Sequence, residues 1–91
     1  MLIMWKLVFT KKAEKAFLRL NKNIQKRIKN KLGFYFSTWN PLQYAEKLTD
    51  PKLGTYRFRI GRYRLVFDVD EKWKLIILLV IDIRCQVYKD I

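Results

Sequence analysis

The sequence predicts an α+β domain in which an N-terminal strand and an α-helical hairpin precede a mainly antiparallel, curved sheet of about four strands. Apolar residues recur at helical spacing over residues 13–20 and 24–36, whereas they run together or alternate over 2–9 and beyond residue 55. Turn-forming residues separate the later segments at short intervals. The order β-α-α-β-β-β favours a sheet with the helical hairpin on one face. A length of 91 residues suggests one domain, spanning 1–91.

The first half of the chain predicts one strand followed by two helices. Residues 2–9 are apolar and partly β-branched, and Thr10 can cap the helix that follows. Asn21-Lys22-Asn23 breaks that helix, and a second one starts near Ile24 and ends at Asn40-Pro41. The short break predicts that the two helices pair as an antiparallel hairpin. Their apolar faces are Ala13, Ala16, Phe17 and Leu20, and then Ile24, Ile28, Leu32 and either Tyr35 or Phe36.

The second half predicts a connecting loop and three strands. The loop covers 41–54, and the strands cover 55–60, 63–69 and 74–82, with a tight turn at Gly61-Arg62 between the first two. The last of these strands is almost wholly apolar, which is typical of a central strand covered on both faces. A short final segment covers 84–89. Alternation assigns one set of residues to the core face: Tyr56, Phe58, Ile60, Tyr63, Leu65, Phe67 and Val69.

The chain is strongly basic, with 20 Lys and Arg against 8 Asp and Glu and a net charge of +12. This excess favours a polyanionic partner: nucleic acid first, an acidic protein second and an anionic membrane last, because no amphipathic tail or lipidation motif supports a membrane. The absence of histidine excludes His-containing metal sites and His-based acid–base chemistry. Cys85 is the single cysteine, so we expect a packing residue and no internal disulfide.

The same features set expectations for location and cofactors. The start of the chain lacks a cleavage site of the signal-peptide kind, and the apolar run Leu75–Ile81 is too short to span a bilayer. We therefore expect a cytoplasmic protein without a membrane partner. We also expect no cofactor and no metal.

Four arginines fall within eight positions of the predicted hairpin, at Arg57, Arg59, Arg62 and Arg64. Strand alternation makes Arg57 and Arg59 project together, about 6.5–7 Å apart, which resembles the phosphate spacing of an extended nucleic-acid strand. Arg64 points to the opposite face from the core residues of its strand, so it lies on the same face as Arg57 and Arg59. Arg62 can instead be a turn residue in solvent. Guanidinium groups bind phosphate through forked hydrogen bonds and stabilise a phosphorane electrostatically. This pattern points to RNA cleavage by the RNA's own 2′-hydroxyl, without a protein nucleophile or a metal.

The C-terminal stretch IRCQVYKDI adds two candidates, Arg84 and Tyr88, which can reach the same face from the last segment. Tyrosine has an ordinary pKa of about 10. Several nearby guanidinium groups would lower the pKa of Tyr88 and favour its phenolate as a general base. The candidate catalytic residues are therefore Arg57, Arg59, Arg64, Arg84 and Tyr88.

Plainer interpretations stand beside these. Arginines on an exposed sheet face or an edge strand are often only solvated, and Tyr88 can be a strand aromatic with its hydroxyl in water. Residues 11–31 hold nine Lys and Arg and one acid, Glu14, and form either a surface for ribosomal RNA or a solvated helix face. Packing in the core or at an edge, rather than base stacking, is expected for Trp5, Trp39 and Trp73.

Three stretches share their pattern with a known family. They are F-x-x-x-A-x-K-A-F-x-x-L from Phe9 to Leu20, LGTYRFRIGRYRLVFDVD, which holds G-x-Y-R-x-R-x-G-x-Y-R from Gly54 to Arg64, and the ending IRCQVY. With the element order, they resemble the RelE/ParE-type toxins of bacterial and archaeal toxin–antitoxin pairs over essentially the whole chain. The resemblance implies a RelE/ParE-like fold and a cognate antitoxin that wraps the toxin. It also implies a role in cleaving mRNA in the ribosomal A site for the same five candidates.

The resemblance leaves three functions open. A ribosome-dependent endoribonuclease is favoured, with mRNA and the 16S and 23S rRNA surface as partners through the basic helices. ParE-type toxins instead poison DNA gyrase without catalysis, and an inert relative would only bind RNA or antitoxin. The chain departs from many relatives at Asp82-Ile83-Arg84, where a basic residue before the arginine is missing and a carboxylate is added. Assemblies of this type bind their promoter through the antitoxin, so we expect no direct sequence-specific DNA binding by this chain.

Overall fold

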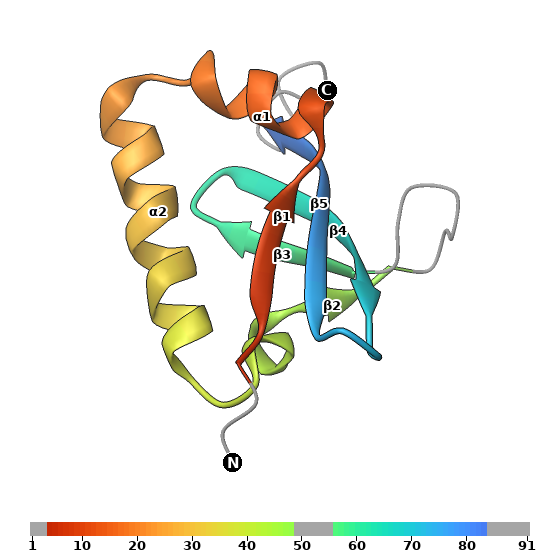
Figure 1. The fold of residues 1–91 in the computed structure, drawn as a ribbon. Helices are drawn as coiled ribbons and strands as arrows, with labels where there is room; N and C mark the ends of the chain where they lie inside the picture. The colour runs from red at the N-terminus through yellow and green to blue at the C-terminus, as the bar shows by residue number, and fades with distance from the viewer. Residues whose placement is uncertain (1–3, 49–55, 84–91) are drawn as a thin grey trace.

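The computed structural model describes residues 4–48 and 56–83, and it has the predicted α+β architecture. Figure 1 shows α1 across one end of the sheet and α2 along its side. The predicted segment 84–89 lies outside the described residues. In chain order the elements are β1 (Lys6–Phe9), α1 (Lys11–Leu18), α2 (Lys22–Ser37), η1 (Pro41–Tyr44), β2 (Glu46–Lys47), β3 (Tyr56–Ile60), β4 (Tyr63–Asp70) and β5 (Leu75–Ile83).

The described strands form one sheet in the order β1-β5-β4-β3-β2. Neighbours pair antiparallel except β1, which pairs parallel with β5, so the sheet is mixed. The sequence predicts four of these strands but places 41–54 in a loop, and so misses η1 and β2. β2 has only two residues, Glu46 and Lys47, which pair with Arg57 and Tyr56. A strand this short has no alternation of its own, and it forms because β3 offers a free edge.

Thr10 ties the start of α1 to the sheet. Its Oγ1 accepts a hydrogen bond from the backbone N–H of Ala13 at 3.1 Å, so Thr10 is the predicted N-cap. The same hydroxyl donates to the carbonyl oxygen of Leu78 on β5 at 2.9 Å, and the backbone N–H of Thr10 donates to that oxygen at 3.0 Å. One residue therefore satisfies a helix terminus and fixes where the helix leaves the sheet.

Gln25 fixes the junction between the two helices. It is buried in α2, and its Nε2 donates to the carbonyl oxygens of Leu18 at 3.3 Å and Leu20 at 2.9 Å, at the end of α1. In Figure 1 the two helices meet at a corner rather than lying side by side as in the antiparallel pairing that we predict. The buried amide holds this corner by satisfying carbonyls that the end of α1 leaves open.

The core lies between the helices and one face of the sheet. The predicted alternation is confirmed, and Tyr35 rather than Phe36 is the buried residue at the end of the α2 stripe. The Tyr35 ring stacks on Tyr44 of η1 at 4.6 Å between centroids and lies 5.0 Å from Phe58. The buried apolar residues are Ala13, Phe17, Ile28, Leu32, Tyr35, Phe58, Ile60, Leu65, Phe67, Ile76 and Leu78.

Some packing predictions are wrong. Trp39 and Trp73 are 79% and 64% exposed, so they are surface residues, whereas Trp5 packs partly against the core as expected. β5 lies inside the sheet as predicted, but its outward-facing residues Leu75 and Ile77 are only half-buried, so its second face is not fully covered. Within the described ranges, no helix has the length and hydrophobicity of a membrane span.

Candidate nucleic-acid interface

Arg57, Arg59 and Arg64 lie together on the face of the sheet opposite the core. They alternate with buried residues such as Phe58 and Leu65 along β3 and β4. The pairing register sets Arg59 directly opposite Arg64. Side chains opposite one another in an antiparallel pair have Cβ atoms about 4.5–5.5 Å apart. The structure therefore brings together three of the predicted site residues, which we call the arginine face.

The turn between the two strands makes this arrangement possible. Gly61 has a φ of 60° at the first central position of a two-residue loop, which is the place of glycine in a type II′ turn. Ile60 then pairs with Tyr63, and this register puts the arginines of both strands on one face. Arg62 is exposed in the turn, as predicted.

The remaining two candidates, Arg84 and Tyr88, lie outside the described residues. β5 ends at Ile83, directly before the first of them. Their positions relative to the arginine face therefore stay a prediction.

Two carboxylates lie among the arginines. One oxygen of Glu46, Oε1, is 2.9 Å from Nε of Arg57 and 3.0 Å from Nε of Arg59. On the neighbouring strand, Oδ2 of Asp82 accepts a hydrogen bond from Nη2 of Arg64 at 2.8 Å. Three guanidinium charges therefore meet two carboxylate charges, 3 − 2 = +1 for these five side chains. The carboxylates offset the repulsion expected between like charges that lie opposite one another.

A small hollow opens on the arginine face. It has a volume of about 110 Å³ and is lined by Leu48, Arg57, Arg64, Val66, Val80 and Asp82. The side chains of Arg57 and Arg64 are sheltered, at 23% and 25% exposure, while Arg59 is 42% exposed. Nε of Arg64 is buried and has no hydrogen-bond acceptor among the described residues. A buried donor without an acceptor is costly, so this N–H is an unsatisfied group beside the ion pair of Arg64 with Asp82.

Sequence reasoning does not include these carboxylates among the site residues. Asp82 draws notice as an added negative charge, but it lies opposite Arg64 only because the β4–β5 register shifts between Val66 and Phe67. Glu46 falls in the predicted loop, 11 residues before Arg57. No sequence pattern pairs it with that arginine, because the contact depends on the edge pairing of β2.

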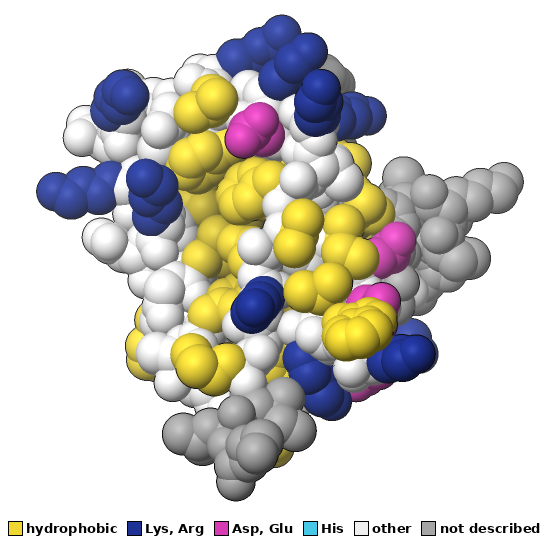
Figure 2. Space-filling model, in the orientation of Figure 1, with side chains coloured by type: hydrophobic (Ala, Val, Ile, Leu, Met, Phe, Trp, Pro, Cys, Tyr) yellow, Lys and Arg dark blue, Asp and Glu magenta, His cyan; other side chains and the backbone are white. Residues whose placement is uncertain are grey.

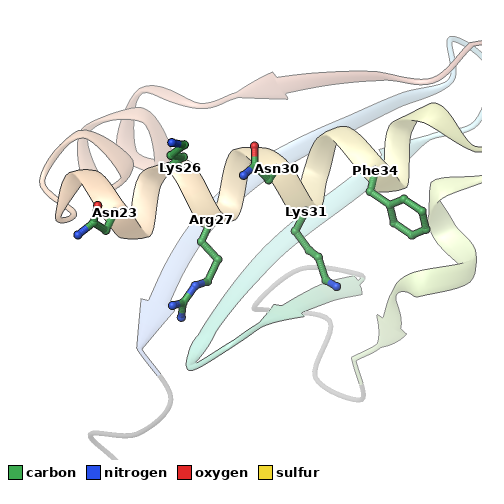
Figure 3. Close-up of a pocket in the computed structure, with 6 residues that line it drawn as sticks. All are labelled: Asn23, Lys26, Arg27, Asn30, Lys31 and Phe34. Carbon is green, nitrogen blue, oxygen red and sulfur yellow. The ribbon is translucent and has the colours of Figure 1, made fainter.

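A second basic surface follows α2 and reaches the β3–β4 turn. All nine Lys and Arg between residues 11 and 31 are exposed. Figure 3 shows Arg27 and Lys31 projecting from α2 toward the hairpin. Nη1 of Arg27 would lie 3.7 Å from a Cβ at Gly61, so this surface adjoins the turn. A shallow pocket of about 560 Å³ marks it, lined by Asn23, Lys26, Arg27, Asn30, Lys31 and Phe34.

A groove of apolar side chains lies between the helices and β1. Figure 2 shows hydrophobic side chains gathered there, with Lys and Arg around them. Leu18 is 63% exposed at its border, and β1 is an edge strand of the described sheet. An edge strand beside an exposed apolar patch is typical of a surface that another chain covers. The groove holds about 340 Å³ and is lined by Leu7, Phe9, Glu14, Phe17, Leu18, Lys29 and Leu32.

Comparison with known proteins gives one family match and several structural matches. Residues 7–88 match the family described as the ParE toxin of type II toxin–antitoxin systems, parDE. A comparison with curated protein sequences found no match.

The structural matches extend over nearly the whole chain. A chain of the toxin–antitoxin complex RelBE2 from Mycobacterium tuberculosis is 24% identical with a TM-score of 0.76, covering 90% of this chain and 100% of that one. A chain of the archaeal RelE–RelB complex from Pyrococcus horikoshii OT3 is 24% identical with a TM-score of 0.70, covering 89% and 96%. The isolated E. coli RelE toxin is 21% identical with a TM-score of 0.69, covering 94% and 93%. These likenesses show a shared fold.

Proposed function

The chain belongs to the ParE toxin family of type II toxin–antitoxin systems, and we propose that this toxin is a ribosome-dependent endoribonuclease that cleaves mRNA and stops translation. The observation that supports it most is the arginine face, where Arg57, Arg59 and Arg64 lie together, Arg57 and Arg64 line a hollow, and Nε of Arg64 is a buried donor without an acceptor among the described residues. Such a cluster is suited to bind a phosphodiester and to stabilise the charge that develops on it.

The proposed reaction uses the RNA's own 2′-hydroxyl. Its oxygen bonds to the adjacent phosphorus while the bond from phosphorus to the next 5′-oxygen breaks, which leaves a 2′,3′-cyclic phosphate and a 5′-hydroxyl. The phenolate of Tyr88 takes the proton of the 2′-hydroxyl, and water protonates the departing oxygen. The three arginines, with Arg84, bind the phosphate and stabilise its charge, and the ribosome contributes the positioning of the mRNA.

We expect Arg64→Ala and Arg84→Ala each to slow mRNA cleavage by about tenfold or more, because each removes a charged donor from the phosphate. The measurement is an in vitro translation reaction with purified protein, in which cut sites in the mRNA are mapped with and without ribosomes. Lys72→Ala, an exposed charge in the β4–β5 turn, is the control and should cleave at the wild-type rate. Wild-type rates in both arginine variants, with the fold intact, would reject this site.

The family match favours a second candidate, inhibition of DNA gyrase without catalysis, since it is the ParE toxin family that residues 7–88 match. The same protein preparation can be tested for inhibition of DNA supercoiling by purified gyrase. Induction in cells separates the two functions: rapid mRNA cleavage at codons supports the nuclease, and DNA damage with intact mRNA supports gyrase inhibition.

An antitoxin is the proposed protein partner. The similar chains from M. tuberculosis and P. horikoshii come from toxin–antitoxin complexes, which supports a comparable partner for this toxin. The apolar groove and the free edge of β1 are the surface proposed for it, because burying them releases apolar area from water. The basic surface of α2 is proposed to contact ribosomal RNA, whose phosphates would neutralise its exposed charges.

A further inference from the structure

We propose that Glu46 and Asp82 act as internal competitors of RNA, so that a phosphate binds the arginine face by displacing a carboxylate that already occupies it. The proposal rests on the proposed RNA-binding function of this face. Its basis is that both carboxylates contact the guanidinium atoms that a phosphate would use.

Glu46 blocks two arginines with one oxygen. Its Oε1 contacts Nε of both Arg57 and Arg59, at 2.9 Å and 3.0 Å. A guanidinium binds a carboxylate or a phosphate most specifically as a fork, in which two N–H groups donate in parallel. With Nε engaged, neither arginine can present the fork that includes it. Displacing this one carboxylate therefore frees two forks at once.

Asp82 fills only half of the fork on Arg64. Its Oδ2 accepts from Nη2 at 2.8 Å, while the neighbouring Nε is buried and has no acceptor within residues 4–48 and 56–83. A phosphate with one oxygen at Nε and another at Nη2 would complete the fork and satisfy the buried N–H. A phosphate that displaces the Asp82 carboxylate would therefore satisfy a buried N–H of Arg64 that the ion pair with Asp82 leaves without an acceptor.

The exchange selects for polyanions over single anions. Glu46 and Asp82 are about half exposed, and ion pairs of this kind are weak enough to open. An isolated anion must displace a carboxylate before it can bind these guanidinium forks, and it brings only one charged group to do so. A nucleic-acid strand brings several linked phosphates, so its later phosphates bind at high effective concentration. The carboxylates therefore raise the number of adjacent phosphates needed for stable binding.

The test measures binding of a single-stranded RNA oligonucleotide to the purified full chain carrying Glu46→Gln, Asp82→Asn or Glu71→Gln. Glu71 is the matched control, because it lies in the β4–β5 turn, pairs with Lys74 at 3.5 Å and changes the net charge by the same amount. We expect the first two variants to bind about three- to tenfold more tightly and the control to change less than about twofold. The salt slope, log K against log salt concentration, should steepen by about 0.7 for each additional phosphate that the protein neutralises.

A second background separates local competition from a general charge effect. In a chain that also carries Arg57→Gln and Arg59→Gln, Glu46→Gln should no longer tighten binding. Tighter binding that persists there, or an equal effect of Glu71→Gln, would overturn the proposal. If Glu46→Gln disrupts the short β2 pairing, Asp82→Asn tests the same idea alone.

The failure of the proposed function has a different signature. RNA affinity that does not change with Arg57→Gln and Arg59→Gln would show that the arginine face does not bind RNA. Affinity that depends on these arginines but is unaffected by Glu46→Gln and Asp82→Asn would overturn only the competitor role.

Discussion

Tyr35 shows how burial changes the chemistry of a single side chain. Its pKa is raised from 10.0, chiefly because burial disfavours the charged phenolate, and the nearby Tyr44 adds to this effect. In the unfolded chain the phenol has its ordinary pKa, so above pH 10 the unfolded state loses a proton that the folded state keeps. The contribution of Tyr35 to the free energy of unfolding is fully present below pH 10. It is lost as the pH rises through the pKa of the folded state.

We therefore expect Tyr35→Phe to flatten the fall in the free energy of unfolding above pH 10. The measurement is chemical denaturation of both proteins at several pH values on either side of that point. An unchanged slope in Tyr35→Phe would show that burial does not set the titration of this group.

The residues of the arginine face were predictable in part. Strand alternation and one glycine turn suffice to place Arg57, Arg59 and Arg64 on a shared face. The positions of their carboxylate partners were not predictable. Glu46 lies 11 residues along the chain from Arg57, and Asp82 lies 18 residues from Arg64. Contacts of this kind depend on strand register, which local patterns do not encode.

At the scale of elements, α1 depends on one hydroxyl. Thr10 caps the helix and bonds to β5, so we expect Thr10→Val to lower the free energy of unfolding by about 1–2 kcal/mol. Thr10→Ser keeps both hydrogen bonds and should lose less than about 0.5 kcal/mol. Urea unfolding followed by circular dichroism measures both. A larger loss in Thr10→Ser than in Thr10→Val would mean that the methyl group of Thr10, rather than its hydroxyl, supports the junction.

The longer elements were predictable because each carries its own periodic pattern. The stripe from Ile24 to Tyr35 identifies α2, and the alternation from Tyr63 to Val69 identifies β4. β2 and the exposed indole of Trp39 were missed for different reasons. The first is created by a neighbouring strand, and for the second hydrophobicity alone does not decide between the core and a surface that a partner covers.

At the scale of the whole molecule, the arginine face and the apolar groove are separate. The arginine face lies on the side of the sheet away from the core, whereas the groove lies between the helices and β1. A partner in the groove therefore need not contact the arginines, and the two surfaces can be changed independently.

We accordingly expect Leu18→Glu to weaken binding of the antitoxin by about tenfold or more while RNA affinity stays within about twofold, because it places a charge in an apolar contact. The measurement is titration with the protein encoded by the adjacent reading frame. Trp73→Glu is a matched control, since Trp73 is 64% exposed against 63% for Leu18 but lies in the β4–β5 turn. A similar loss in both variants would argue against the groove as the contact surface.

The parallel pairing of β1 with β5 has a consequence for synthesis. Thr10 bonds to Leu78, 68 residues later, so among the described strands the first to be made pairs with the last. While the nascent chain is still growing, β1 and β4 lack the strand that joins them, and Asp82 is not yet present beside Arg64. A fragment that stops before β5 cannot complete the sheet, because β5 pairs with both β1 and β4. An incomplete chain therefore lacks the full fold of the toxin.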